Sequence, residues 1–247
     1  MIYVDRDYRL RFDSSLEMHC LVVKETDLAI YLPKGVWNEQ IAFKTEQFIR
    51  QRRLELEEYI KLDPDFATTH NPYLVDPTIA PPIALAMARA GNLAGVGPMA
   101  AVAGAFSFAV GQFLLTYSPE VVVENGGDIF IAGKQDRVIG VFAGKSPFSN
   151  KIGIKISKKS LPLGVCTSSG TVGPSFSYGK ADAVVILSPD ALLADAVATA
   201  AANVIQTEED LEKSVDLAKT IKGVTGILAI KNSQMAAWGD IELVPLQ

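Results

Sequence analysis

The sequence predicts an α+β protein with a largely antiparallel sheet and paired helices. Predicted strands, then helices, then strands follow one another up to residue 131, and roughly the same order returns afterwards. Such segregated runs are typical of α+β folds. No segment has the composition of a flexible linker, and 247 residues with 49% hydrophobic content suffice for one large core. We therefore expect a single domain over residues 1–247, with a loose internal duplication of about 1–131 and 132–247.

The first half of the chain combines predicted strands with three predicted helices. A charged amphipathic helix is expected over residues 38–62, followed by a loop rich in Pro, Asp, Asn and Thr over 63–82. Prolines suited to a first helical turn open the other two helices, over 82–90 and 98–116. The strands before this helical region are expected near residues 8–12, 18–23 and 28–31.

The chain after residue 119 is predicted to hold most of the strands. Ser188 is the expected N-cap of a helix whose first helical residue is Pro189, and residues 207–210 cap another helix. The strands are expected near residues 120–124, 128–132, 137–142, 151–157, 183–187, 225–230 and 240–244.

Charge and composition argue against nucleic acid and a membrane as partners. The net charge is −5 and the basic residues are dispersed, which argues against nucleic acid. Residues 90–119 carry no charge and are long enough to span a bilayer. However, this run is built from Ala and Gly and contains Gln112, which favours a helix packed on all sides. Because the N-terminus lacks the apolar segment of a signal peptide, we expect a cytoplasmic protein with no membrane partner, and we leave a homo-oligomer open.

Residues 121–131 contain two valine-rich or isoleucine-rich halves separated by Asn125, Gly126, Gly127 and Asp128. One interpretation is a hairpin, because a type I′ turn needs positive φ at both central residues. The other is a ligand site. Paired glycines let a ligand approach the backbone closely, and Asn125 and Asp128 supply polar contacts.

A carboxylate interrupts the small apolar residues of 191–203. Asp195 and Thr199 are four residues apart, so they share one face of a helix. A carboxylate buried there is costly to desolvate unless it has a partner. It is either a core aspartate bonded to backbone amides or, with the hydroxyl of Thr199, a ligand of a hard cation such as Mg²⁺. We favour the cation.

A second polar segment follows Cys166. Thr167, Ser168, Ser169 and Gly170 form a run of the kind that makes anion nests, although loops of this composition are common. Cys166 is more typical of a buried structural thiol than of a nucleophile, since no histidine lies near it in the sequence.

Glycines also precede the helix expected over 98–116. The spacing of Gly95 and Gly97 matches a permissive dinucleotide fingerprint, which carries weight only after a strand. Residues 82–90 are predicted to be helical, which argues against a Rossmann unit. Gly97 still leads into a helix N-terminus, whose free amides could meet a phosphate.

Together these segments resemble the ApbE superfamily, typified by FAD:protein FMN transferases that use Mg²⁺ to split FAD and attach FMN to a threonine of a target protein. The family blocks are a small-residue helix start, an Asn-x-Gly-Gly-Asp strand, a Thr-Ser-Gly loop and an Ala-Asp-x-x-x-Thr helix. The matching segments are residues 95–104, 125–128, 167–170 and 194–199. The resemblance implies a T-fold-like duplicated architecture, FAD or FMN as cofactor, and Asp195 and Thr199 as metal ligands.

The resemblance also places Gly126, Gly127 and Asp128 on the flavin-side strand, which favours the ligand interpretation of that stretch. The sequence departs from the transferases at two points. It has no lysine before Gly104, and after Gly170 it lacks both the histidine and the Asp-Pro-x-Thr-Gly element. We therefore expect a short cytoplasmic member of the superfamily in which FMN transfer is weak or absent.

Three functions stay open at this point. The chain is a Mg²⁺-dependent transferase or hydrolase acting on a flavin or nucleotide, a module that binds such a ligand without turning it over, or a sulfur-assimilation enzyme that uses Cys166. The missing lysine and histidine favour binding over transfer. We expect a small-molecule flavin or nucleotide with Mg²⁺ as the partner, and the sequence identifies no catalytic residue.

Overall fold

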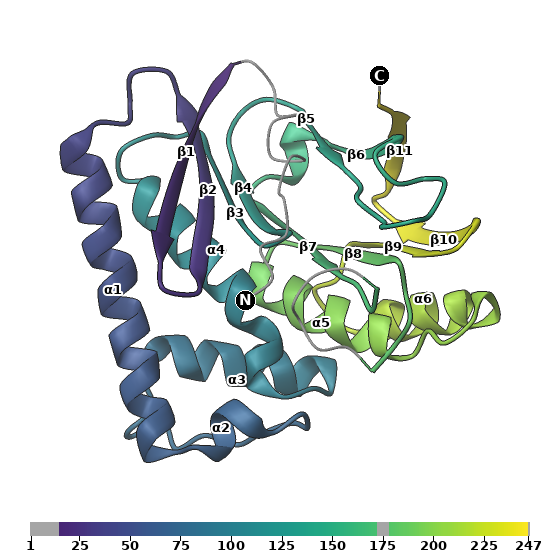
Figure 1. Cartoon of the computed structure of the whole chain (residues 1–247), viewed down its shortest axis with the longest axis horizontal. Helices are drawn as coiled ribbons and strands as arrows, with labels where there is room; N and C mark the ends of the chain where they lie inside the picture. Colours follow the sequence, from purple (N-terminus) through teal and green to yellow (C-terminus); the bar gives the residue numbers. More distant parts are fainter. Residues whose placement is uncertain (1–14, 172–177, 247) are drawn as a thin grey trace.

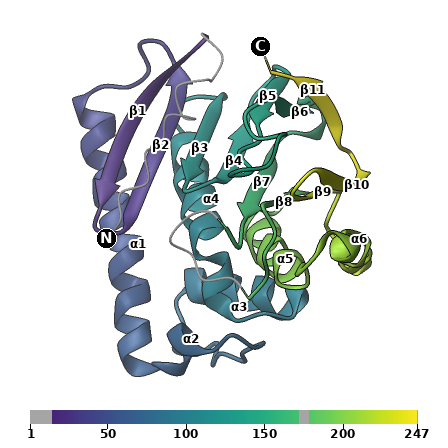
Figure 2. The same cartoon turned by 45° about the vertical axis from the view of Figure 1, so that its right-hand side comes forward.

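The computed structural model describes residues 15–171 and 178–246, which form a layered α+β fold (Figures 1 and 2). The middle layer is an eight-stranded sheet made of β1 (Leu16–Val23), β2 (Thr26–Pro33), β3 (Val121–Asn125), β4 (Asp128–Ala132), β7 (Leu163–Ser168), β8 (Ala183–Ser188), β9 (Gly226–Lys231) and β10 (Gln234–Gly239). The strands lie in that order, and each neighbouring pair is antiparallel. The predicted fold class is confirmed.

A smaller antiparallel sheet covers one face of the large one (Figure 1). Its strands are β5 (Arg137–Gly140), β6 (Ile152–Ile156) and β11 (Glu242–Pro245), in the order β11-β6-β5. Ile139 and Ile154 of the small sheet share one apolar cluster with Tyr31, Val122 and Val185 of the large sheet. The two sheets therefore enclose a core of their own.

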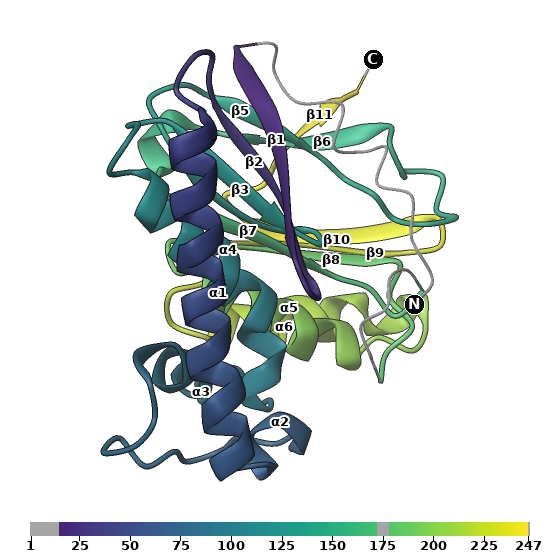
Figure 3. The same cartoon turned by 60° about the vertical axis from the view of Figure 1, so that its left-hand side comes forward.

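Helices cover the opposite face, and the long α1 stands beside β1 and β2 (Figure 3). They are α1 (Glu39–Leu62), α2 (Asp65–Thr68), α3 (Pro82–Ala94), α4 (Val102–Leu114), α5 (Ala191–Asn203) and α6 (Leu211–Thr220). The side chains of β2 contribute to both cores, because successive side chains of a strand point to opposite faces of the sheet. Leu28 and Ile30 pack against the helices, whereas Ala29 and Tyr31 pack against the small sheet.

Several predicted boundaries hold and others change. Asn38 is the N-cap of α1 and accepts a hydrogen bond from Ile41 N at 3.0 Å, so the helix begins where the sequence placed it. The helix expected over 98–116 is a 3-10 turn over Pro98–Ala101 that leads into α4. The expected loop over 63–82 contains the short α2. The strand expected near 8–12 lies outside the described residues.

Two predictions for the second half are wrong. The N-cap of α5 is Asp190, not Ser188, because the Asp190 carboxylate accepts from Leu192 N and Leu193 N at 3.0 and 3.3 Å. Ser188 instead ends β8, and its hydroxyl accepts from Asp190 N. The sequence also missed β7 and β10. In β7, Thr167 and Ser168 pair with Val185 and Val184 of β8, so they are strand residues where a loop was expected.

The uncharged run of residues 90–119 is divided between the end of α3 and the segment that contains α4. Among the described residues, no single helix has the length and apolar composition to cross a bilayer. Pro82–Ala94 and Pro98–Leu114 meet that test only as a pair, and the pair is bent by 103°.

Candidate functional site

The stretch around Gly126 is a tight hairpin between β3 and β4. Asn125 pairs with Asp128, and the two residues between them have positive φ, 68° at Gly126 and 105° at Gly127. Glu124 closes the turn, because its Oε1 accepts from Gly127 N at 2.7 Å. The hairpin interpretation is confirmed, with Gly-Gly rather than Asn-Gly as the central pair.

The same hairpin carries a buried carboxylate toward α5. Asp128 of β4 and Asp195 of α5, which are distant in the sequence, are both buried, at 7% and 8% exposure. The Oδ1 atom of Asp128 is buried and has no hydrogen-bond partner among the described residues. Glu124, on the adjacent strand, is also buried, at 1% exposure. Three acidic side chains are thus buried at this end of the sheet.

Burial raises the pKa of both aspartates. Loss of solvent raises the pKa of Asp128 well above its ordinary value, and the neighbouring Asp195 raises it further, while hydrogen bonding from Cys166 and Thr167 opposes the rise. Burial also raises the pKa of Asp195 to about 7, against hydrogen bonds from the amides of Gly104 and Ala103. In the absence of a cation, two adjacent buried carboxylates therefore resist ionising together.

We call Asp128 and Asp195 the acid pair. The start of α4 contacts this pair through Asp195. Gly104 N donates to Asp195 Oδ2 at 2.8 Å. A Cβ at Gly104 would lie 2.5 Å from Ala191 O, so only glycine lets α4 approach α5 this closely. One residue earlier, Ala103 O accepts from Asn125 Nδ2 at 3.2 Å. The hairpin and α5 therefore converge on the same helix start.

Two more predicted residues lie beside the acid pair. Cys166 is fully buried, and its thiol contacts Ala191 O at 3.3 Å. Burial raises the pKa of this thiol well above its ordinary value, and Asp128 and Asp195 add to the rise. The prediction of a buried thiol is confirmed. Thr167 follows at the end of β7, and a Cβ at Gly127 would lie 3.8 Å from Thr167 Cβ.

Three other residues predicted to bind the ligand, Ser169, Gly170 and Gly97, form hydrogen bonds with other parts of the chain. Ser169 Oγ donates to Ala181 O, and Gly170 N donates to the same carbonyl at 2.9 Å. Gly97 is buried against the backbone of Thr69, and its N–H donates to His70 O at 2.9 Å, so this amide is already occupied.

Thr199 is half-buried one turn after Asp195 on α5. The part of the chain that the structure describes contains no group of three or more His, Cys, Asp or Glu side chains arranged to hold a metal.

Sequence reasoning missed Glu124 and Arg53. Glu124 could have been found from its position in an apolar strand, because a carboxylate buried there needs a hydrogen-bonding or charged partner. Arg53 could not, because it lies in a charged helix where basic residues usually face solvent. In the structure its guanidinium donates to Thr26 Oγ1 at 2.6 Å and pairs with Glu25 and Glu57.

A pocket of about 360 Å³ lies between α1 and the start of α4. We call it the α1–α4 pocket. Ala103 and Asn125, which are joined by a hydrogen bond at the start of α4, line it. Its other lining residues are Glu25, Thr26, Arg53, Leu56, Glu57, Ile60, Met99, Val102 and Phe106.

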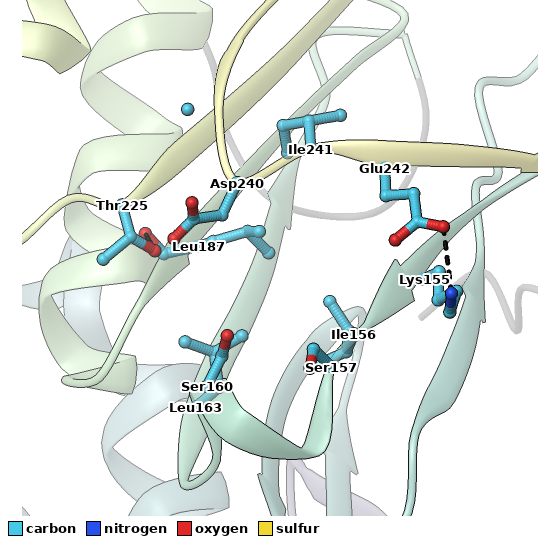
Figure 4. A pocket seen from close by; sticks show the side chains of 11 residues that line it. Lys155, Ile156, Ser157, Ser160, Leu163, Leu187, Thr225, Asp240, Ile241 and Glu242 are labelled. Atoms are coloured by element: carbon cyan, nitrogen blue, oxygen red, sulfur yellow. Dashed lines mark hydrogen bonds and ion pairs between the residues drawn. The ribbon is translucent and has the colours of Figure 1, made fainter.

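Another pocket, of about 310 Å³, lies between the small sheet and the large one (Figure 4). Figure 4 shows Thr225 and Asp240 on one side and Ser157 and Ser160 on another, with an ion pair of 3.0 Å between Lys155 and Glu242. None of the residues predicted to bind a ligand lines it. The α1–α4 pocket is therefore the one linked to the predicted site.

The chain also matches a known protein family. The family model described as "AbpE bacteria" matches residues 11–237. The chain belongs to this ApbE-like family. It is also 38% identical over 233 residues to a UPF0280 protein of Methanocaldococcus jannaschii, with 91% of each chain covered. A UPF0280 protein of Methanosarcina acetivorans is 41% identical over 198 residues, covering 79% of this chain and 78% of the relative.

Solved structures of ApbE proteins share the fold. The apo flavinyl transferase ApbE of Pseudomonas stutzeri superposes with a TM-score of 0.54 at 13% identity, covering 93% of this chain and 96% of its own. The ApbE protein of Thermotoga maritima gives a TM-score of 0.55 at 16% identity, with 91% and 97% covered. At such identities the likeness establishes the ApbE fold alone. The family model and the sequence relatives confirm the predicted family.

Proposed function

We propose that this ApbE-like protein binds a flavin or related nucleotide together with Mg²⁺, and that the cation is held at the acid pair. The observation that carries the proposal is the unpartnered Oδ1 of Asp128, buried beside the carboxylate of Asp195. An isolated buried carboxylate is costly, and two that repel each other are costlier. A divalent cation would remove both penalties.

The donor set suits Mg²⁺. Asp128, Asp195 and the predicted ligand Thr199 offer oxygen atoms only, which hard cations prefer. Mg²⁺ is commonly held by one or two carboxylates, with waters and substrate phosphates completing its shell. Two carboxylates with few other protein ligands fit that pattern. When bound, Mg²⁺ would supply charge neutralisation and polarisation of a phosphoryl oxygen.

The chain's own residues prepare this site. The amide of Gly104 holds Asp195 in place, and the Glu124–Gly127 contact fixes the turn that positions Asp128. Asn125 points its amide toward the start of α4, next to the α1–α4 pocket. The flavin part of the proposal is supported by the fold shared with a flavinyl transferase and by the predicted flavin-side position of the hairpin.

Binding is favoured over FMN transfer. The sequence has neither the lysine nor the histidine of the transferase blocks, and the predicted ligand residues offer no replacement base near the acid pair. The third function, sulfur chemistry at Cys166, finds no support. A fully buried thiol with a raised pKa is neither accessible nor a thiolate at neutral pH.

The proposal is tested by thermal unfolding with FAD, FMN and adenine nucleotides, each with and without Mg²⁺. A ligand at one hundred times its Kd stabilises the folded state by about 2.7 kcal/mol. We expect at least one flavin or nucleotide to raise Tm, and to raise it further with Mg²⁺. A flat response across the whole panel would contradict the proposal.

A further inference from the structure

The pocket between the two sheets has no role in the proposed function (Figure 4). We call it the intersheet pocket. Its most buried lining residues are Ile156, Leu163 and Leu187, each 2% exposed or less, and all three belong to the core between the sheets. Asp195 instead lies on α5, which covers the opposite face of the large sheet. The intersheet pocket is therefore a separate site, and its volume of about 310 Å³ is in the range of small-molecule sites.

Backbone contacts hold one wall of the intersheet pocket in place. Asp240 N donates to Thr225 O at 2.9 Å, and Thr225 N donates to Leu187 O at 2.8 Å. Gly239, with a φ of 77°, lets the chain turn tightly over Thr225, because a Cβ there would lie 2.0 Å from Thr225 O. The side chains of Asp240 and Thr225 are thus carried on the same side of the pocket by a fixed backbone (Figure 4).

The charged groups of the lining leave one carboxylate unmatched. They are Lys155, Asp240 and Glu242. Lys155 Nζ pairs with Glu242 Oε1 at 3.0 Å, whereas the carboxylate of Asp240 makes no hydrogen bond or ion pair with the described residues. Two further lysines, Lys158 and Lys159, lie outside the lining. A cation in this pocket would match the charge of Asp240, and an anion would be repelled by it.

The hydroxyl beside Asp240 offers an acceptor to the same ligand. Thr225 Oγ1 donates its proton to Leu187 O at 3.3 Å, so its lone pairs remain available. An ammonium group has several N–H donors and no acceptor, which matches a carboxylate next to a hydroxyl oxygen. The buried Leu163 and Leu187 give the rest of such a ligand an apolar surface.

We propose that the intersheet pocket binds a small organic ammonium ion. Its ammonium group donates to the carboxylate of Asp240 and to Thr225 Oγ1, and its apolar body packs on Leu163 and Leu187. Ser157 and Ser160 close the other side of the pocket (Figure 4). This inference does not depend on the flavin or on the cation at the acid pair.

Three compounds with the same apolar body and different head groups test the chemistry of the ligand. They are phenethylamine, phenethyl alcohol and phenylacetate, each titrated by calorimetry into the full-length protein in EDTA. Phenethylamine is expected to bind about fivefold more tightly than the alcohol, because an ion pair with an exposed carboxylate adds only modestly to affinity. Phenylacetate is expected not to bind detectably. Equal affinities for the amine and the alcohol would overturn the proposal.

A change of charge at one position tests the location. Asp240→Asn keeps the size of an exposed side chain and removes its charge, so its affinity for phenethylamine is expected to fall to that of the alcohol. Asp216→Asn removes the same charge from α6, at a carboxylate that is 71% exposed and outside the lining. This matched control is expected to bind phenethylamine as the wild type does.

A pocket-filling variant gives an independent readout. Ser160→Phe places a ring in the pocket from the side opposite Asp240, at an exposed position, and is expected to abolish binding of the amine and the alcohol alike. The Tm of each variant shows that the fold is kept. If both Asp240→Asn and Ser160→Phe bind phenethylamine as the wild type does, or if the wild type does not bind it, the proposal is overturned. The panel of flavins and nucleotides tests the proposed function separately.

Discussion

The carboxylate of Asp195 accepts a hydrogen bond from the backbone N–H of Gly104 at 2.8 Å, which joins α5 to the start of α4. This close contact requires glycine at position 104, because a Cβ there would lie 2.8 Å from Asp195 Cβ and closer still to Ala191 O. It also shows that Asp195 has features of both sequence interpretations. It is bonded to a backbone amide, and it lies beside a second carboxylate, that of Asp128, whose Oδ1 has no partner among the described residues.

The first prediction concerns stability against pH in the metal-free protein. The pKa of Asp195 rises from 3.8 to about 7 on folding, so the folded state holds more protons than the unfolded chain between those values. Stability from this group is therefore lost as pH rises through that window. Asp195→Asn carries no charge, so its Tm in EDTA is expected to equal or exceed that of the wild type, with the advantage growing from pH 4 to 7.

Measuring both proteins across the same pH series cancels the other titrating groups. Several carboxyls, including Glu57 and Asp210, have lowered pKa values and stabilise the fold as pH rises, in both proteins alike. If Asp195→Asn melts clearly lower than the wild type at pH 7 in EDTA and keeps the full response to Mg²⁺, Asp195 is a structural acceptor and the site assignment fails.

The second prediction concerns the β3–β4 turn. An added Cβ at Gly126 meets no atom within 4 Å, so any cost of substitution comes from its φ of 68°. Gly126→Ala is expected to lower the free energy of unfolding by about 1–2 kcal/mol, whereas Gly126→Asn, which tolerates this conformation, costs much less. Urea unfolding of the two variants measures the difference. Equal losses would mean that the turn is held by something other than backbone conformation.

The third prediction distinguishes the two thiols. Cys20 is exposed and Cys166 is fully buried with a raised pKa. One thiol is expected to react with a disulfide reagent in the native protein and a second only after unfolding. Cys166→Ser keeps a donor beside Asp128 and is expected to leave ligand binding intact, with Cys20→Ser as the matched control. Fast labelling of Cys166 in the native protein would restore the sulfur-chemistry hypothesis.

The fourth prediction concerns catalysis. Covalent transfer of FMN to a threonine peptide is expected to be weak or absent, because the transferase lysine and histidine have no counterpart in the sequence. Mass spectrometry of the peptide after incubation with FAD and Mg²⁺ measures the transfer, with an established ApbE transferase as positive control. Robust flavinylation by this protein would show that the missing elements are dispensable.

The sequence predicted the fold class and most elements because their signals are local. The Asn38 cap and the prolines before α3 and α4 act within one helical turn. The β7 strand was missed since Thr167 and Ser168 read as loop residues, and only pairing with β8 makes them extended. Tertiary context overrode local composition there.

The site was predictable in part. Asp128 and Asp195 each stood out as carboxylates among apolar neighbours, but nothing in the sequence places them side by side. Their proximity depends on the glycine-mediated approach of α4 to α5 and on the register of β4 with β7. The role of Arg53 could not be predicted for the same reason, since its partner Glu25 lies on the turn between β1 and β2 and its partner Thr26 begins β2.

The most direct test of the account is calorimetric titration of FAD into the wild type and Asp195→Asn, each in Mg²⁺ and in EDTA. A carboxylate that holds the cation makes FAD affinity depend on Mg²⁺, and removing its charge removes that dependence. We predict a lower Kd in Mg²⁺ than in EDTA for the wild type and the same Kd in both buffers for Asp195→Asn. Equal affinities in Mg²⁺ and EDTA for the wild type, or an unchanged Mg²⁺ effect in the variant, would contradict a cation site at the acid pair.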